Sequence, residues 1–114
     1  MSELGDRLRE LRLAAGWSQR KLAAQLGVGF PHVSKIEAGT EKPSDELLGR
    51  LADVLGAERD ELFLLAQRVP DDVRRQVLDK GPLAVQFYRR WQSGAFTDAQ
   101  VEKFLADNDE QDKQ

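Results

Sequence analysis

With 114 residues, of which 32% are charged and 40% hydrophobic, the chain has the length and composition of one globular domain, or of one domain with a short appendage. It has no cysteine, no apolar run near the ~18 residues of a membrane span, and no signal-peptide pattern in its first residues. This excludes disulfides and cysteine-ligated zinc, and it predicts a cytoplasmic protein with no membrane partner.

The net charge of −3 argues against a protein that coats nucleic acid without selectivity, but the charge is unevenly distributed. Residues 7–50 hold eight basic and five acidic side chains, whereas residues 51–114 hold nine and thirteen. A basic face on the first part of the chain matters more for contact with phosphates than the overall charge does.

Helical spacing of apolar residues predicts five helices before residue 70. Leu4, Leu8 and Leu11 repeat at this spacing and indicate the first of them. Ser18 and Ser44 are typical N-cap residues for the second and the fourth. The predicted ranges are about 4–15, 19–26, 30–38, 45–55 and 59–67.

The second and third predicted helices are joined by a tight turn at Gly27, where the backbone needs a residue that tolerates positive φ. Ala23 is small enough to let the two helices cross closely. Together they predict a helix-turn-helix, an arrangement that places one helix in a DNA major groove.

Pro70 marks a boundary, after which three further helices are predicted at about 71–79, 83–92 and 98–106. Thr97 and Gln100 are spaced as a capping box for the last of them. No strand pattern is present, so we expect an all-α chain. Its predicted parts are a DNA-binding domain at 1–69, a helical dimerisation or partner segment at 70–107, and a disordered end at 108–114.

The C-terminal segment holds five of the eight aromatic residues, more ring surface than three short helices can bury alone. It must pack on the first domain, on a second copy of itself, or on a partner. We favour a dimer interface built from the apolar residues of this segment, which are Leu83, Phe87, Tyr88, Trp91, Phe96, Val101, Phe104 and Leu105.

Several phrases of the sequence carry a family resemblance: Gly-Trp-Ser-Gln at 16–19, Leu-Ala-Ala-Gln-Leu-Gly-Val at 22–28 and Val-Ser-Lys-Ile-Glu-Ala-Gly at 33–39. Over residues 4–67 the chain resembles the Cro/C1-type, or XRE, helix-turn-helix regulators of bacteria and phage. The resemblance implies a five-helix, lambda-repressor-like domain that binds a two-fold symmetric DNA operator as a homodimer, without a cofactor.

The resemblance also implies roles for individual residues. The third helix would read bases through Gly29, Phe30, Pro31, Ser34 and Lys35, and Arg12 would form a structural ion pair with Glu37. Phosphates would be contacted by Gln19, Arg20, His32, Thr40 and Lys42. Because the side chains of Phe30 and Pro31 donate no hydrogen bonds, we expect this protein to recognise DNA more through apolar contacts and DNA shape than is usual in the family.

Plainer interpretations stay open for some of these residues. Lys35, Arg20 and His32 are also compatible with solvated surface positions, and Trp17 is better explained as a core residue than as a base-stacking one. His32 is the only histidine, so neither a metal site nor an enzyme is expected.

The leading hypothesis is a dimeric transcriptional repressor, inactivated through its C-terminal segment, for example when a regulatory protease cuts it. The first alternative is an antitoxin that binds a toxin through this segment and regulates its own operon. The second is an interaction adaptor whose helix-turn-helix no longer binds DNA.

Overall fold

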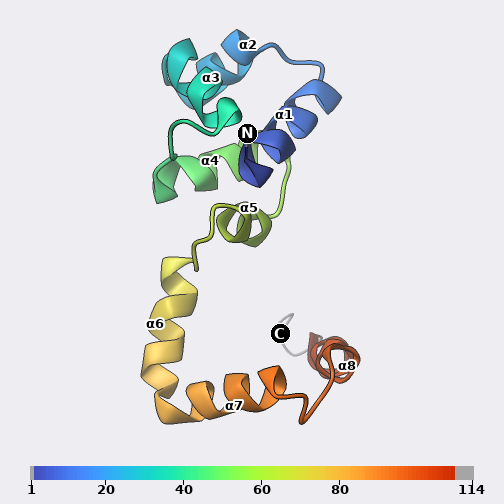
Figure 1. Ribbon diagram of the computed structural model, residues 1–114. Coiled ribbons are helices and arrows are strands. Elements are labelled where there is room, and N and C mark those ends of the chain that lie inside the picture. The colour runs from blue at the N-terminus through green and yellow to red at the C-terminus, as the bar shows by residue number, and fades with distance from the viewer. Residues whose placement is uncertain (1, 110–114) are drawn as a thin grey trace. The chain divides into compact units, whose positions relative to one another are not determined.

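The computed structural model describes residues 2–109, and every regular element within that range is a helix, which confirms the predicted fold class. Contacts divide the chain into two compact units between Asp71 and Asp72. The helices of the described residues are α1 Glu3–Ala14, α2 Gln19–Leu26, α3 Phe30–Ala38, α4 Asp45–Leu55, α5 Arg59–Leu65, α6 Asp71–Lys80, α7 Pro82–Gln92 and α8 Asp98–Asn108 (Figure 1).

The first unit has a single hydrophobic core, built from the apolar stripes that helical spacing predicts. Leu8, Leu48, Leu62 and Phe63 are at most 1% exposed, and α2 and α3 add buried aliphatic side chains of their own. Figure 1 shows α1 to α5 gathered around this core, with α2 and α3 meeting at one end of the unit. The helix-turn-helix therefore rests on a packed scaffold.

Local capping sets the ends of α2 and α4 where the sequence predicts them. The Ser18 hydroxyl accepts a hydrogen bond from the backbone N–H of Lys21 at 3.0 Å, and the Ser44 hydroxyl accepts one from Leu47 at 3.1 Å. Gly27 closes α2 with φ of +72°, a backbone conformation that side chains with a Cβ rarely adopt. These three predictions are confirmed.

The end of α5 differs from its prediction. The helix stops at Leu65, two residues earlier than expected, because Gln67 adopts a left-handed φ of 59°. The backbone N–H of Arg68 then donates to the carbonyl of Phe63 at 2.9 Å and closes the turn. The end of α1 differs by one residue, since it stops at Ala14 rather than Ala15.

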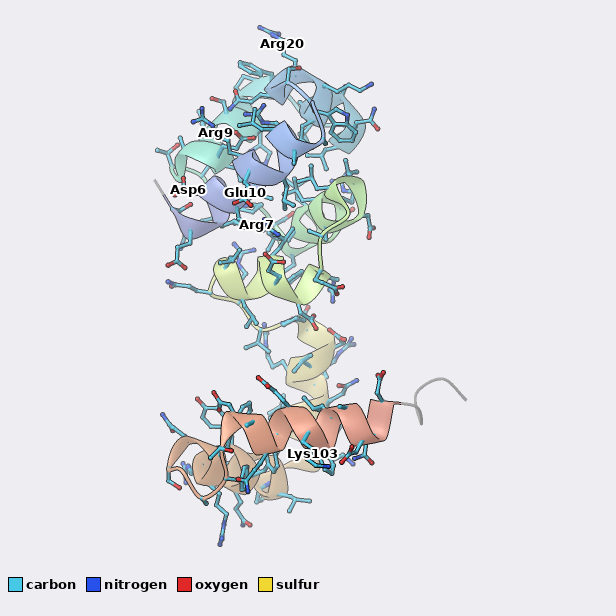
Figure 2. The ribbon with its side chains drawn as sticks, turned by 90° about the vertical axis from the view of Figure 1, so that its right-hand side faces the viewer. Asp6, Arg7, Arg9, Glu10, Arg20 and Lys103 are labelled. Carbon is cyan, nitrogen blue, oxygen red and sulfur yellow. The ribbon has the colours of Figure 1, made fainter. Side chains whose placement is uncertain are left out.

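Polar contacts also join α1 to α5. Arg7 donates through Nε to Glu61 and through Nη1 to Glu10, both at 2.8 Å, and Figure 2 shows Arg7 and Glu10 next to each other on α1. The hydrogen bond to Glu61 raises the pKa of the Arg7 guanidinium above its ordinary value. Arginine is charged at any working pH, so the contact with Glu61 is an ion pair between α1 and α5.

The second unit consists of α6, α7 and α8, and none of the described residues in these three helices is buried. The capping box of Thr97 and Gln100 is present, with hydrogen bonds of 2.8 and 3.1 Å, as predicted. Helix α8 continues to Asn108, which is the first residue of the end predicted to be disordered at 108–114, and residues 110–114 of that end lie outside the described residues. No helix within residues 2–109 has the length and apolar character needed to cross a membrane.

Candidate nucleic-acid interface

Helices α2 and α3 cross closely because small or apolar side chains line their contact. Ala23 is 3% exposed, and the N–H of Val28 donates to the Ala23 carbonyl at 3.1 Å across the Gly27 turn. Val33 and Ile36 of α3 enter the core on the same side. The opposite side of α3 is left exposed, as a helix that enters a DNA groove requires.

One buried carboxylate connects the first three helices. Glu37 of α3 accepts hydrogen bonds from Arg12 Nε at 2.8 Å and Arg12 Nη2 at 3.0 Å, and a third from Gln19 Nε2 at 3.1 Å. Arg12 Nη1 also donates to the carbonyl of Trp17 at 2.8 Å. The predicted partners Arg12 and Glu37 thus lie together, and the pair holds α3 against α1 and the start of α2.

Gly5 is a residue of this scaffold that the sequence analysis missed. A Cβ atom at this position would overlap the backbone carbonyl of Glu37 and lie 3.0 Å from the carbonyl oxygen of Ile36. The C-terminal end of α3 therefore approaches the backbone of α1 more closely than any other residue type would allow. The available signal was a glycine inside a helical pattern, between Leu4 and Leu8.

The residues predicted to read bases lie at the N-terminal end and on the outer side of α3. Gly29, Pro31 and Lys35 are exposed, and Ser34 is half-buried. Phe30 is half-buried and packs against the core. Gly29 forms the N-cap without a side-chain hydrogen bond.

Arg20, a predicted phosphate contact, lies on the ring of Phe30. Its guanidinium carbon is 4.5 Å from the ring centroid, within the range of a cation–π interaction. Figure 2 shows Arg20 at the outer edge of the first unit, on α2. Both residues are predicted interface residues, but the contact between them does not follow from the sequence.

The other predicted phosphate contacts lie on either side of α3. His32 Nδ1 is 3.2 Å from a Glu41 oxygen, so the imidazole has an acidic neighbour that the sequence analysis did not identify. Thr40 donates through its hydroxyl to the Lys35 carbonyl at 3.3 Å, and Lys42 is exposed in the loop that follows. Gln19 differs from these, because its side-chain amide is hydrogen-bonded to Glu37.

Three aromatic residues of the second unit form a cluster, in which Phe87 is 51% exposed and Trp91 and Phe96 are half-buried. The rings of Phe87 and Phe96 are 5.1 Å apart, and those of Phe87 and Trp91 are 6.3 Å apart. An open pocket of about 260 Å³ is lined by Phe87, Phe96, Gln100, Val101 and Phe104. Trp91 donates through Nε1 to Asp98 at 2.6 Å, which joins α7 to the start of α8.

The predicted interface residues of this unit are largely open to solvent. Leu83 is 68% exposed, Phe104 63%, Leu105 61% and Tyr88 57%. Isolated domains rarely present so many large apolar side chains on short helices. No group of three or more potential metal ligands occurs within residues 2–109.

Comparisons with known proteins cover mainly the first unit. A family described as "Helix-turn-helix domain" matches residues 3–65, more than half of the chain. An uncharacterised HTH-type transcriptional regulator of Mycobacterium tuberculosis (strain ATCC 25618 / H37Rv) is 33% identical over 75 residues, which are 66% of this chain and 54% of the relative. The chain spans about half the length of the curated relatives it matches.

Solved structures similar to the chain include a controller protein and a protein complex. The restriction-modification controller protein C.AhdI from Aeromonas hydrophila is 42% identical, with a TM-score of 0.50 over 53% of this chain and 91% of that chain. A SinR protein/SinI protein complex covers 97% of this chain and 99% of that chain with a TM-score of 0.52. At 21% identity, the second likeness concerns the fold alone.

Proposed function

The chain belongs to the helix-turn-helix family of DNA-binding transcriptional regulators, and from this premise we propose that it is a dimeric repressor of a two-fold symmetric operator. Two copies place α3 in successive major grooves, about 34 Å apart on one side of the duplex. Bound there, the dimer blocks a promoter, and it acts in the cytoplasm where that DNA is found.

The observation that carries this proposal is the way α3 is held and exposed. The bonds from Arg12 and Gln19 to Glu37 fix its inner side, whereas Lys35 is exposed on its outer side. A rigid helix with an exposed cation suits the negatively charged groove of DNA. No hydrogen bond or ion pair occupies the Lys35 side chain within the described part of the chain, so it is available to a guanine.

Residues around α3 supply the proposed contacts with the DNA backbone. Lys42 and Thr40 lie in the loop after α3, and Gln19 begins α2, where the helix N-terminus favours a phosphate. His32 contributes when it turns from Glu41 toward a phosphate. These contacts set the register of the protein on DNA, while Ser34, Lys35 and Phe30 supply sequence preference.

The second unit is proposed to form the dimer. Its helices bury no described residue, so its exposed rings and aliphatic side chains gain most by packing against the same surface of a second copy. A dimer brings two copies of α3 to one operator, and it raises the affinity well above that of one domain. Loss of the second unit, for example by a regulatory protease, would release the DNA.

Selection of binding sites from a random duplex library tests this function. The full chain and residues 1–71 are selected in parallel, since the buried core lies within the first unit. The proposal predicts a two-fold symmetric motif for the full chain and a weaker half-site for residues 1–71. If neither protein enriches a motif, it is not a sequence-specific regulator.

A second candidate function is an antitoxin whose C-terminal unit binds a toxin. The specific observation in its favour is the open apolar pocket around Phe87 and Phe104, which suits a partner chain as well as a second copy. Sedimentation of the purified full chain distinguishes the antitoxin from the homodimeric repressor. A monomer at micromolar concentration that binds one co-expressed partner in a fixed ratio would favour the antitoxin over the homodimer.

A further inference from the structure

The first turn of α3 offers few hydrogen-bond donors to a base edge. Gly29 has no side chain, and the side chains of Phe30 and Pro31 contain no donor. His32 has Glu41 at 3.2 Å from its Nδ1. Bases in the major groove are recognised by hydrogen bonds as well as by contacts with methyl groups. The first turn of α3 alone therefore lacks side-chain donors for recognising a base.

Arg20 supplies the missing donors from the neighbouring helix. Its guanidinium carbon lies 4.5 Å from the centre of the Phe30 ring, at the N-terminal end of α3. Its side chain is exposed, and it makes no hydrogen bond or ion pair with any described residue. The five N–H donors of the guanidinium are therefore solvent-exposed and available to a ligand outside the chain.

The contact with Phe30 restricts where the guanidinium can go. Phe30 is half-buried and packs against the core, which limits the rotamers open to its ring compared with a fully exposed side chain. An arginine stacked on an aromatic face loses less conformational freedom when it binds, and its planar fork matches the O6 and N7 acceptors of guanine. A phosphate contact needs charge but no such platform.

We propose that Arg20 is a specificity-determining residue that recognises a guanine beside the N-terminal end of α3, with Phe30 as its positioning residue. This inference rests on the proposed function, because it needs α3 in the major groove. It replaces the phosphate role that the sequence predicts for Arg20. The methyl group of a neighbouring thymine would contact the free part of the Phe30 ring.

Site selection with variants of the full chain tests the proposal. Arg20→Lys keeps the positive charge but loses the stacked planar fork, and Phe30→Leu keeps an apolar contact while removing the platform. Both variants are expected to lose preference for guanine at the same one position in each half-site. Lys21→Ala is the matched control, because it removes the neighbouring exposed charge of α2 and should leave the preferred bases unchanged.

A modified base gives the second measurement. Replacing the guanine at that position by 7-deazaguanine removes the N7 acceptor, and it should lower wild-type affinity on the order of 10-fold while changing the affinity of Arg20→Ala by less than about 2-fold. If Arg20→Lys, Arg20→Ala and Phe30→Leu weaken all sites equally and select the wild-type motif, Arg20 contacts phosphate and the inference is overturned. If the wild-type chain selects no motif, the proposed function fails first and the inference fails with it.

Discussion

The guanidinium of Arg12 and the carboxylate of Glu37 meet side by side, with side-chain exposures of 9% and 5% and two hydrogen bonds of 2.8 and 3.0 Å. Because Gln19 donates to the same carboxylate, this pair fixes the angle between α3 and the rest of the first unit. Desolvation of the two buried charges offsets much of their attraction, so the pair need not add to the net stability of the first unit. Its effect on the orientation of α3 can therefore be tested separately from its effect on stability.

Replacing one partner of the Arg12–Glu37 pair should lower the stability of the first unit strongly. Glu37→Gln keeps the shape of the side chain but leaves the Arg12 charge buried without a counter-ion, so the free energy of unfolding should fall by about 3–5 kcal/mol. Chemical denaturation measures the loss. The double variant Arg12→Met with Glu37→Leu should regain most of the stability but bind the selected operator more weakly. A Glu37→Gln protein as stable as the wild type would contradict this view of the pair.

Gly5→Ala should destabilise the first unit by at least about 1–3 kcal/mol, because the added methyl group overlaps the Glu37 carbonyl and pushes α3 away from α1. Gly49→Ala is a matched control within α4. There the nearest atom to a new Cβ is Arg59 Nε at 3.8 Å, and the loss of glycine should stabilise the helix by roughly 0.5–1 kcal/mol. Thermal unfolding of the two variants should shift in opposite directions, and equal shifts would argue against the close approach.

Lys42→Ala should weaken binding to all duplexes to a similar extent. If Lys42 contacts a phosphate, the slope of log affinity against log salt should become shallower by about 0.9 for each protomer. Lys103→Ala serves as the control, since this lysine is on α8 (Figure 2). It pairs there with Asp107 at 2.9 Å. An unchanged slope for Lys42→Ala would place this lysine outside the DNA contact.

Phe104→Ser should weaken self-association of the full chain on the order of 10-fold, because Phe104 is 63% exposed and lines the apolar pocket of the second unit. The stability of the first unit should not change, since Phe104 is not part of its core. Sedimentation equilibrium measures the association, with Glu102→Ala on the same helix as control. Equal association constants for the two variants would exclude Phe104 from the dimer interface.

The parts of the fold that depend on residues close together along the chain are predictable from the sequence. Ser18 and Gly27 act within one turn of chain, so the boundaries of α2 follow from local capping rules. Gln67 carries no such signal, because a left-handed residue that is not glycine depends on the packing around it. The end of α5 was placed two residues late for this reason.

Contacts between helices were harder to predict. Three contacts were not predicted, because each depends on how helices or turns pack against one another. They are the close approach of Gly5 to Glu37, the stacking of Arg20 on Phe30, and the proximity of His32 to Glu41. A single sequence gives the residue types but not these distances. The family resemblance suggested Arg12 and Glu37 as partners, and the roles of the DNA-facing residues remain predictions.

The most direct test of the central claim is a hydroxyl-radical footprint of the full chain on its selected duplex. If two copies insert α3 into successive major grooves, the footprint should show symmetric protected patches about 10 base pairs apart, centred on the two half-sites. The fragment of residues 1–71 should give the same patches only at much higher concentration. Uniform protection, or a single patch with no symmetric counterpart, would contradict a dimer that reads DNA through α3.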